Sequence, residues 1–218
     1  MIKLVIFDLD GTLIEFHHDF LLSESERIFQ QLAMPHITRE ILQHGFERFN
    51  FFHFIEEQER IEFEKKFWEH FDFSKVPRPK VLPGAEQILS HIADRQIPQV
   101  IVTARTAPEE HVLETLQHTC IPKYIERIVT RVEDDLHWSD KRQMLREICA
   151  EYQTEAEAVL LIGDTPADIK SAEEIGITHR IAVLTGGILP EILVAANPTI
   201  VVNHLEEFYE LHLDKFFR

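Results

Sequence analysis

Short apolar runs alternate along most of the chain with longer stretches in which apolar residues recur at helical spacing. The apolar runs predict β-strands at residues 4–7, 99–103, 127–129, 158–162, 180–183 and 199–202. The stretches between them predict helices at residues 85–95, 109–118, 141–152, 167–174 and 190–195. Alternating strands and helices are typical of a parallel sheet whose two faces are both covered by helices. We therefore predict an α/β core of this kind.

One stretch interrupts this alternation. From about residue 15 to residue 73 the sequence favours helices and contains no clear strand, and a proline-rich connector follows at residues 76–84. We therefore predict a core domain of residues 1–14 and 80–218 and a small helical insertion at residues 15–79. Phenylalanines crowd the second half of the insertion, together with Trp68. Apolar residues of this kind usually form a core of their own. The alternative is that some of them cover a substrate or contact a second copy of the chain.

The composition indicates a globular protein and narrows its partners. The 218 residues are 44% apolar and 28% charged, which suffices for one core and an insertion at about 150 residues per domain. The net charge of −16 opposes binding to nucleic acid or to an anionic membrane, because such binding depends on Lys and Arg near phosphates. It does not oppose a small phosphorylated metabolite, because a bound cation can reverse the field within one cleft.

Cysteine usage and hydropathy suggest a compartment. Cys120 and Cys149 are the only cysteines and form no C-x-x-C pair, which favours a reducing compartment. No apolar run approaches the roughly 20 residues of a membrane span. The first predicted strand begins close to Met1, which leaves no room for a signal peptide. We therefore expect a cytoplasmic protein.

Two carboxylates follow the first predicted strand, in the sequence DLDGTL at residues 8–13. Side chains two positions apart on a strand share a face, where two acids repel each other and cost desolvation energy, a penalty that a divalent cation together with a phosphoryl group would remove. A carboxylate can attack phosphorus and form an acyl-phosphate, so Asp8 is a candidate nucleophile. Asp10 is then a candidate acid for the leaving oxygen and base for the attacking water. We expect Gly11 to adopt backbone angles that favour glycine and Thr12 to cap the turn. The alternative is an ordinary turn with solvated acids.

A second acidic sequence, GDTPAD at residues 163–168, follows another predicted strand. Ligands of open parallel sheets bind at the carboxyl ends of the strands, so we expect Asp164 to join Asp8 in a Mg²⁺ site. The metal would reduce the repulsion between an anionic nucleophile and an anionic substrate. Asp168 allows two interpretations: with Thr165 it fits a helix-capping box, and it also fits an acid that supports the metal site from behind.

Three more residues are candidates for binding substrate. The Thr103 hydroxyl and the backbone N–H groups after it, beginning with Ala104, are expected to hold phosphate oxygens at a helix start. Ser139 is a good helix cap, which places Lys141 in the first turn of the next helix, where a cation opposes the helix dipole. A nearby phosphate would compensate for that opposition. Arg105 either binds an acidic group of the substrate or is a surface arginine.

Together these features resemble the haloacid dehalogenase superfamily of phosphohydrolases. The resemblance covers most of the chain outside the insertion and includes four motifs in order: DLDGTL, the strand that ends in Thr103, Lys141, and GDTPAD. It implies a Rossmann-like core, and it implies that the insertion is a small cap similar to that of the phosphoglycolate phosphatases. Such caps close over the substrate and exclude water. One position departs from the family pattern, because Arg142 follows the lysine where the family often has proline.

The resemblance also implies roles for single residues. Asp8 matches the family's nucleophile and Asp10 its acid and base. Thr103 and Lys141 match positions that bind the phosphate, and Asp164 matches a metal ligand. In such enzymes Mg²⁺ also contacts the backbone carbonyl at the position of Asp10, so the resemblance implies metal binding by Asp8, Asp10 and Asp164.

The leading hypothesis is a Mg²⁺-dependent phosphatase that acts on a small phosphomonoester, as a monomer or a homodimer. A sugar-phosphate mutase would keep Asp10, whereas dehalogenases on this scaffold lack it. A phosphonate hydrolase would need a cap lysine, for which Lys65 and Lys66 are available. A binding protein without activity would have no reason to keep acids that repel each other. We expect the terminal Phe216 and Phe217 to pack on the chain's own core, the alternative being a partner chain.

Overall fold

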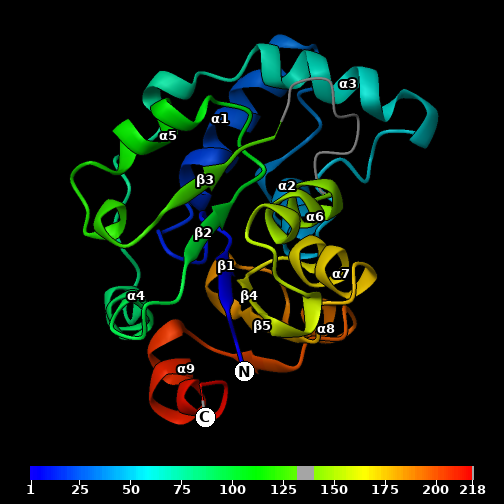
Figure 1. Cartoon of the computed structure of the whole chain (residues 1–218). Helices are drawn as coiled ribbons and strands as arrows, with labels where there is room; N and C mark the ends of the chain where they lie inside the picture. The colour runs from blue at the N-terminus through cyan, green and yellow to red at the C-terminus, as the bar shows by residue number, and fades with distance from the viewer. Residues whose placement is uncertain (132–139, 218) are drawn as a thin grey trace. The chain divides into compact units, whose positions relative to one another are not determined.

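A parallel sheet forms the centre of the protein. The computed structural model describes residues 1–131 and 140–217. The sheet has six strands in the order β3-β2-β1-β4-β5-β6, and every neighbouring pair is parallel (Figure 1). The strands are β1 (Leu4–Phe7), β2 (Gln99–Val102), β3 (Arg127–Val129), β4 (Val159–Gly163), β5 (His179–Val183) and β6 (Ile200–Val202). All the predicted strands are confirmed, with ends that differ by one residue or none.

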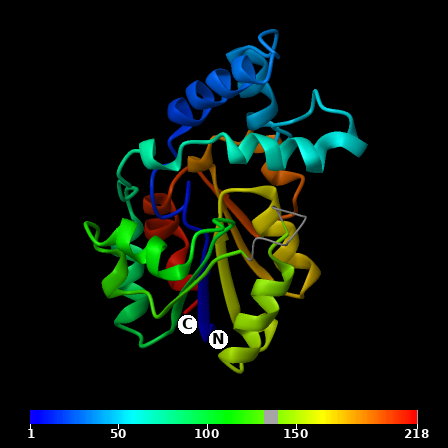
Figure 2. The same ribbon diagram turned by 90° about the horizontal axis from the view of Figure 1, so that it is seen from above.

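Helices cover both faces of this sheet. They are α4 (Ala85–Ala93), α5 (Glu109–Leu116), α6 (Arg142–Glu151), α7 (Pro166–Glu174), α8 (Pro190–Val194) and α9 (Leu205–Leu211). Figures 1 and 2 show α4, α5 and α9 on one face and α6 and α7 on the other. Rossmann-like topology and the predicted α/β class are therefore confirmed. Within the described ranges, every helix is too short or too polar to cross a bilayer.

Helix α9 was absent from the sequence prediction. It spans seven residues, too few to establish a helical period by themselves. Its start packs so closely on the start of α4 that a Cβ atom on Gly84 would lie 2.2 Å from the Glu206 nitrogen. Gly84 also has a φ of +85°, which favours glycine. Tertiary contact therefore fixes both helix starts.

The core of this part of the chain is built on β1. All four residues of β1 are buried, because strands run on both sides of it and helices cover both faces. Val5 and Phe7 belong to the main apolar cluster, which also contains Ile162 of β4. Phe216 and Phe217 pack against the same cluster. The expectation that they dock on the chain's own core is confirmed.

The chain divides into two compact units. The core unit comprises Met1–Phe16, Pro79–Gly186 and Pro190–Arg218, and the inserted unit comprises His17–Arg78 and Gly187–Leu189. The inserted unit contains α1 (His18–Gln31), α2 (Arg39–Glu47) and α3 (Glu57–Glu69). Its short return segment is tied to α2, because the Leu189 N–H donates to the Glu47 carbonyl at 2.9 Å.

Aromatic rings form the core of the inserted unit. Phe29, Phe52 and Phe67 are buried, and their ring centroids lie 5.1–5.6 Å apart in the pairs that Phe67 makes with the other two. Further phenylalanines, among them Phe54 and Phe63, pack against this cluster. The prediction that the phenylalanines form the insertion's own core is confirmed.

Candidate active site

Three polar side chains follow three neighbouring strands of the sheet. Asp8 comes directly after β1, Thr103 after β2 and Asp164 after β4. Because β1 lies between β2 and β4, parallel pairing brings these strand ends to one edge. The backbone continues the sheet pattern at this point, since the Asp8 N–H donates to the Ile162 carbonyl at 2.9 Å. The order and direction of the three strands therefore bring these side chains together.

The turn after Asp8 fits closely around Asp164. Gly11 has a φ of +82°, and a Cβ atom on it would lie 2.5 Å from Asp164 Oδ2. Thr12 is fully buried, and its hydroxyl donates to Asp164 Oδ1 at 3.0 Å. The expected conformation of Gly11 is confirmed. Thr12 was expected to cap the turn, but its buried hydroxyl donates to Asp164 instead.

Three buried acids lie close together. Asp8, Asp164 and Asp168 each present a carboxylate oxygen, and these oxygens lie within 4.8 Å of one another. The three side chains are buried. Oxygen donors of this kind are what Mg²⁺ prefers, and the cluster therefore fits that ion.

Lys141 is the cation inside this cluster. Its ammonium donates to Asp8 Oδ1, to Asp168 Oδ1 at 2.6 Å and to the Val102 carbonyl at 3.1 Å, which occupies all three donors. Lys141 occupies the N-cap position of α6 and not the first turn as predicted, because α6 begins at Arg142. Ser139, the predicted cap, lies outside the described residues.

Asp168 caps helix α7 and also contacts Lys141. Its Oδ2 accepts from the Thr165 N–H at 3.0 Å and from the Thr165 hydroxyl at 2.6 Å, while the Asp168 N–H donates to Thr165 Oγ1. This is a complete capping box at the start of α7. Its Oδ1 accepts from Lys141. Both oxygens are therefore engaged, which leaves Asp8 and Asp164 as the acids of the cluster best able to bind a cation directly.

Burial sets the acidity of the cluster. In the protein without metal, loss of solvation raises the pKa of Asp8 to about 6, a rise that the Lys141 ammonium opposes and the Asp168 carboxylate increases. Burial raises the pKa of Asp164 well above its usual value, and Asp8 adds to that rise. The pKa of Lys141 is raised despite burial, because Asp168 and Asp8 stabilise the ammonium. A divalent cation would supply positive charge that stabilises the ionised carboxylates of Asp8 and Asp164.

Asp10 lies apart from the acidic cluster, paired with Arg105. The Arg105 Nε donates to Asp10 Oδ2 at 2.7 Å and its Nη2 to Asp10 Oδ1 at 2.6 Å. Each side chain is 27% exposed. The interpretation of Arg105 as an ordinary surface arginine is wrong, because a planar guanidinium matches a carboxylate with two parallel hydrogen bonds.

Thr103 and Ala104 lie at the end of β2, in a loop. Thr103 is buried, and its hydroxyl oxygen accepts from the Arg105 N–H at 3.3 Å, whereas Ala104 is half-buried. Helix α5 begins only at Glu109. The backbone N–H groups after Thr103 therefore belong to a loop and not to a helix start as expected.

The loop after β5 also contributes, and sequence reasoning missed it. The Thr185 hydroxyl donates to the Gly11 carbonyl at 2.5 Å. A Cβ atom on Gly186 would lie 1.8 Å from Asp164 Oδ2, so only glycine fits beside that carboxylate. One signal was available in the sequence: Thr185 and Gly186 follow a predicted strand whose carboxyl end lies at the same sheet edge.

The sequence matches a known family over most of its length. Residues 5–183 match the haloacid dehalogenase-like hydrolase family. The chain belongs to this family. It is accordingly an enzyme of the hydrolase type, as predicted. No curated protein matches the sequence.

Solved structures of this hydrolase family share the fold. A haloacid dehalogenase-like hydrolase from Streptococcus pneumoniae is 18% identical, with a TM-score of 0.74, and the match covers 100% of this chain and 99% of that one. A predicted phosphoglycolate phosphatase from Haemophilus somnus is 15% identical, with a TM-score of 0.66 and coverage of 97% and 98%. A protein from Thermotoga maritima, provisionally assigned as a β-phosphoglucomutase, is 20% identical, with a TM-score of 0.65 and coverage of 95% and 97%.

Proposed function

We propose that this hydrolase is a Mg²⁺-dependent phosphatase that hydrolyses a small phosphomonoester through an aspartyl-phosphate on Asp8. The observation that carries the proposal is the setting of Asp8. It is a buried carboxylate at the carboxyl edge of the sheet, held by Lys141 and placed beside Asp164. Burying several carboxylates side by side is costly, and Lys141 supplies only one positive charge to offset that cost.

Asp8 and Asp164 would hold the metal, together with the backbone carbonyl of Asp10. When bound, Mg²⁺ would neutralise negative charge on the phosphoryl group and on the two carboxylates. Asp168 would keep Lys141 in place from behind, since one of its oxygens accepts from the ammonium. The phosphoryl oxygens would contact the Thr103 hydroxyl and the Ala104 N–H, and Lys141 would turn one of its three N–H groups from Asp8 to a phosphoryl oxygen when the substrate binds.

Asp8 would form a bond to phosphorus while the bond from phosphorus to the ester oxygen breaks. The leaving oxygen would take the electron pair of that bond and a proton from Asp10. In the second step a water molecule would attack phosphorus, Asp10 would accept its proton, and the bond between Asp8 and phosphorus would break. Asp10 returns to its protonated form, so the cycle balances.

The inserted unit is proposed to act as a cap. It enters the chain after β1 and carries its own aromatic core, so its surface can vary without disturbing the sheet. We propose that this unit determines which leaving group is accepted, whereas the core unit binds the phosphoryl group. The substrate is proposed to be a small phosphorylated metabolite.

Turnover of p-nitrophenyl phosphate tests the proposal. We expect hydrolysis that requires Mg²⁺ and is lost in Asp8→Asn, and a fall of about 10²-fold or more in kcat in Asp10→Asn, because Asp10 activates the attacking water. Phosphate covalently trapped on wild-type protein and absent from Asp8→Asn would identify the nucleophile. Equal turnover by wild type and Asp8→Asn would contradict the proposal. A panel of phosphorylated metabolites ranked by kcat/KM would then identify the leaving group.

A mutase is the second candidate. The structural match to the Thermotoga maritima protein that carries a β-phosphoglucomutase assignment favours it. A mutase returns the phosphoryl group of Asp8 to a sugar, whereas a phosphatase transfers it to water. Product analysis with hexose phosphates separates the two: free phosphate indicates a phosphatase, and an isomeric hexose phosphate without net release of phosphate indicates a mutase.

A further inference from the structure

Arg105 makes a two-point contact with Asp10. Its Nε and Nη2 donate to the two carboxylate oxygens at 2.7 and 2.6 Å. Both residues belong to the core unit and follow neighbouring strands, Asp10 after β1 and Arg105 after β2. A two-point pair fixes the plane of the carboxylate as well as its position.

Arg105 is itself held at several points. Its N–H donates to Thr103 Oγ1 at 3.3 Å, and its carbonyl accepts from the Arg131 N–H at 2.9 Å. Its Nη1 lies 3.5 Å from Thr115 Oγ1 on α5. The first two contacts fix the backbone of Arg105 and the third holds its guanidinium, so less conformational entropy is lost when the pair with Asp10 forms.

The pair keeps the Asp10 carboxylate away from the buried acids. Asp8, Asp164 and Asp168 gather their oxygens within 4.8 Å, and among the described residues the Asp10 side chain is not part of that group. Asp10 is the more exposed acid, at 27%, against 9% for the side chain of Asp8. Its carboxylate is therefore free of the metal-binding cluster and open to a leaving group or to water.

We propose that Arg105 is a positioning residue that holds the ionised Asp10 carboxylate in the orientation needed to accept the proton of the attacking water. The inference rests on the proposed phosphatase function and goes beyond it. Arg105 acts through Asp10. Without it, the Asp10 carboxylate rotates freely and serves the attacking water only part of the time.

The split between kcat and kcat/KM tests this role. For p-nitrophenyl phosphate, kcat/KM reports the steps up to formation of the aspartyl-phosphate, in which this leaving group scarcely needs a proton, whereas kcat also includes the attack of water, which needs Asp10 as a base. In Arg105→Gln we expect kcat for p-nitrophenyl phosphate to fall by about tenfold or more, and kcat/KM to fall by clearly less. Arg105→Lys should restore part of the loss, because it keeps the charge but not the two-point contact.

A double-mutant cycle completes the test. Adding Arg105→Gln to Asp10→Asn should cause no further loss, because the residue then has nothing to position. Equal losses in kcat and in kcat/KM, or an additive loss in the double variant, would overturn the proposal. So would a rise in KM confined to substrates with a second anionic group, which would mean that Arg105 binds substrate.

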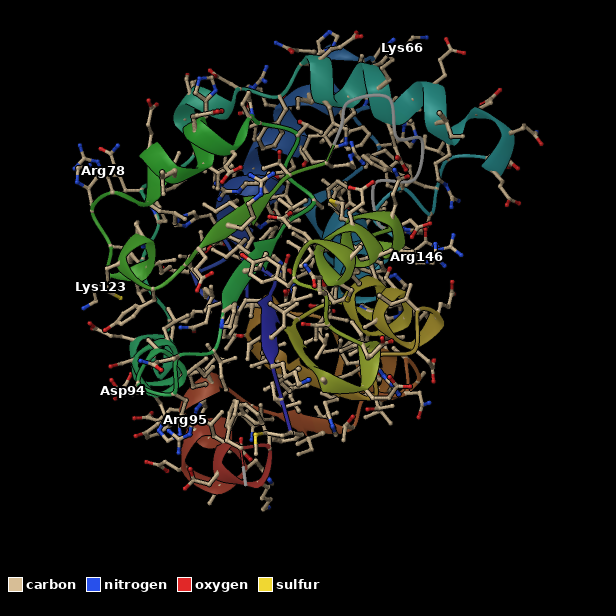
Figure 3. All side chains as sticks on the ribbon, viewed as in Figure 1. Lys66, Arg78, Asp94, Arg95, Lys123 and Arg146 are labelled. Atoms are coloured by element: carbon tan, nitrogen blue, oxygen red, sulfur yellow. The ribbon has the colours of Figure 1, made fainter. Side chains whose placement is uncertain are left out.

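Arg95→Gln is the matched control. Arg95 is an exposed arginine of the core unit, paired with Asp214 at 3.4 Å and close to α9 at the other end of the sheet (Figure 3). It should leave both kcat and kcat/KM unchanged, and melting temperatures of all variants show whether they fold. Wild type without turnover would overturn the phosphatase function and this inference together. Wild type with turnover and an additive double variant would overturn this inference alone.

Discussion

At the scale of single residues, the ion pair between Asp8 and Lys141 is the most consequential contact. Both side chains are buried, at 9% and 5% exposure, so neither charge has water to replace its partner. Breaking such a pair by removing one partner usually costs more than the pair contributes, because a buried charge remains. Lys141 contributes further to stability because it also forms an ion pair with Asp168.

We predict that Lys141→Met lowers the free energy of unfolding by roughly 3 kcal/mol at pH 7 in the absence of Mg²⁺. Turnover of p-nitrophenyl phosphate should fall by about 10²-fold. Urea unfolding followed by circular dichroism measures the first quantity. The control is Lys123→Met, which removes an exposed lysine paired with Glu86 and should leave both quantities unchanged (Figure 3). Equal effects of the two substitutions would contradict the argument that the ion pair of Lys141 matters because it is buried.

Acidity at the same residues predicts how stability depends on pH. Burial raises the pKa of Asp8 to about 6, so between its ordinary pKa and that value the folded state binds more protons than the unfolded state. The contribution of Asp8 to stability is therefore present at low pH and is lost as pH rises through about 6. Asp164 acts in the same direction, because its pKa is also raised.

We accordingly predict that Asp8→Asn becomes more stable relative to wild type as pH rises from 5 to 7.5 in EDTA. Saturating Mg²⁺ should stabilise wild type more at pH 7.5 than at pH 5, because ionised carboxylates bind the ion. Chemical unfolding at both pH values, with and without Mg²⁺, provides the comparison. A stability difference between the two proteins that does not change with pH would contradict the raised pKa.

Sequence reasoning predicted much of the site at this scale, and it failed for identifiable reasons. The pattern of apolar runs predicted that Asp8, Thr103 and Asp164 each follow a strand, and the parallel sheet brings the carboxyl ends of those strands to one edge. The order of the strands within the sheet is not encoded in that pattern. The partner of Arg105 depends on where a long flexible side chain points, which no local pattern encodes. The position of Lys141 was displaced by one residue because helix ends are less certain than helix existence.

At the scale of elements, the start of α7 contributes both to helix stability and to the proposed active site. Thr165 and Asp168 cap this helix reciprocally, and Asp168 also contacts Lys141. The strands were predictable because their apolar runs are continuous. Helix α9 was not, because seven residues give too short a pattern and tertiary contact with α4 stabilises it.

Two substitutions at the start of α7 should therefore differ in cost. Thr165→Ala removes only the cap and should lower the free energy of unfolding by about 1 kcal/mol. Asp168→Ala also leaves Lys141 without one of its two carboxylates, and should cost about 3 kcal/mol or more. Urea unfolding in EDTA measures both. Equal costs for the two variants would indicate that the contact between Asp168 and Lys141 adds nothing to stability.

At the scale of the whole molecule, two apolar cores are built from different parts of the chain. One surrounds the sheet and the other joins the aromatic rings of the inserted unit. The sequence prediction of a core and an insertion rests on the same contrast, because predicted strands stop where the insertion begins and resume after the prolines. It could not predict that Gly187–Leu189 belongs with the inserted unit, since that segment is held by tertiary contact at Glu47.

Separate cores predict a local response to a core substitution. Phe67 is fully buried in the inserted unit, and Phe67→Ala should cost about 3–5 kcal/mol there. Amide hydrogen exchange should accelerate in α1, α2 and α3 and stay unchanged in β1 and β4. Mass spectrometry of deuterated peptides measures this. Acceleration throughout the chain would mean that the two cores unfold as one.

The central place of β1 has a consequence for synthesis on the ribosome. Its pairing partners β2 and β4 end at residues 102 and 163, so at about 5–20 residues per second roughly 3–12 seconds separate their completion. During that interval a strand of four apolar residues has one bare edge, which is a template for wrong pairing. Asp164, which the proposed site needs beside Asp8, is synthesised only after the same interval. Slow translation between these two strands would therefore favour aggregation of the nascent chain before it could become active.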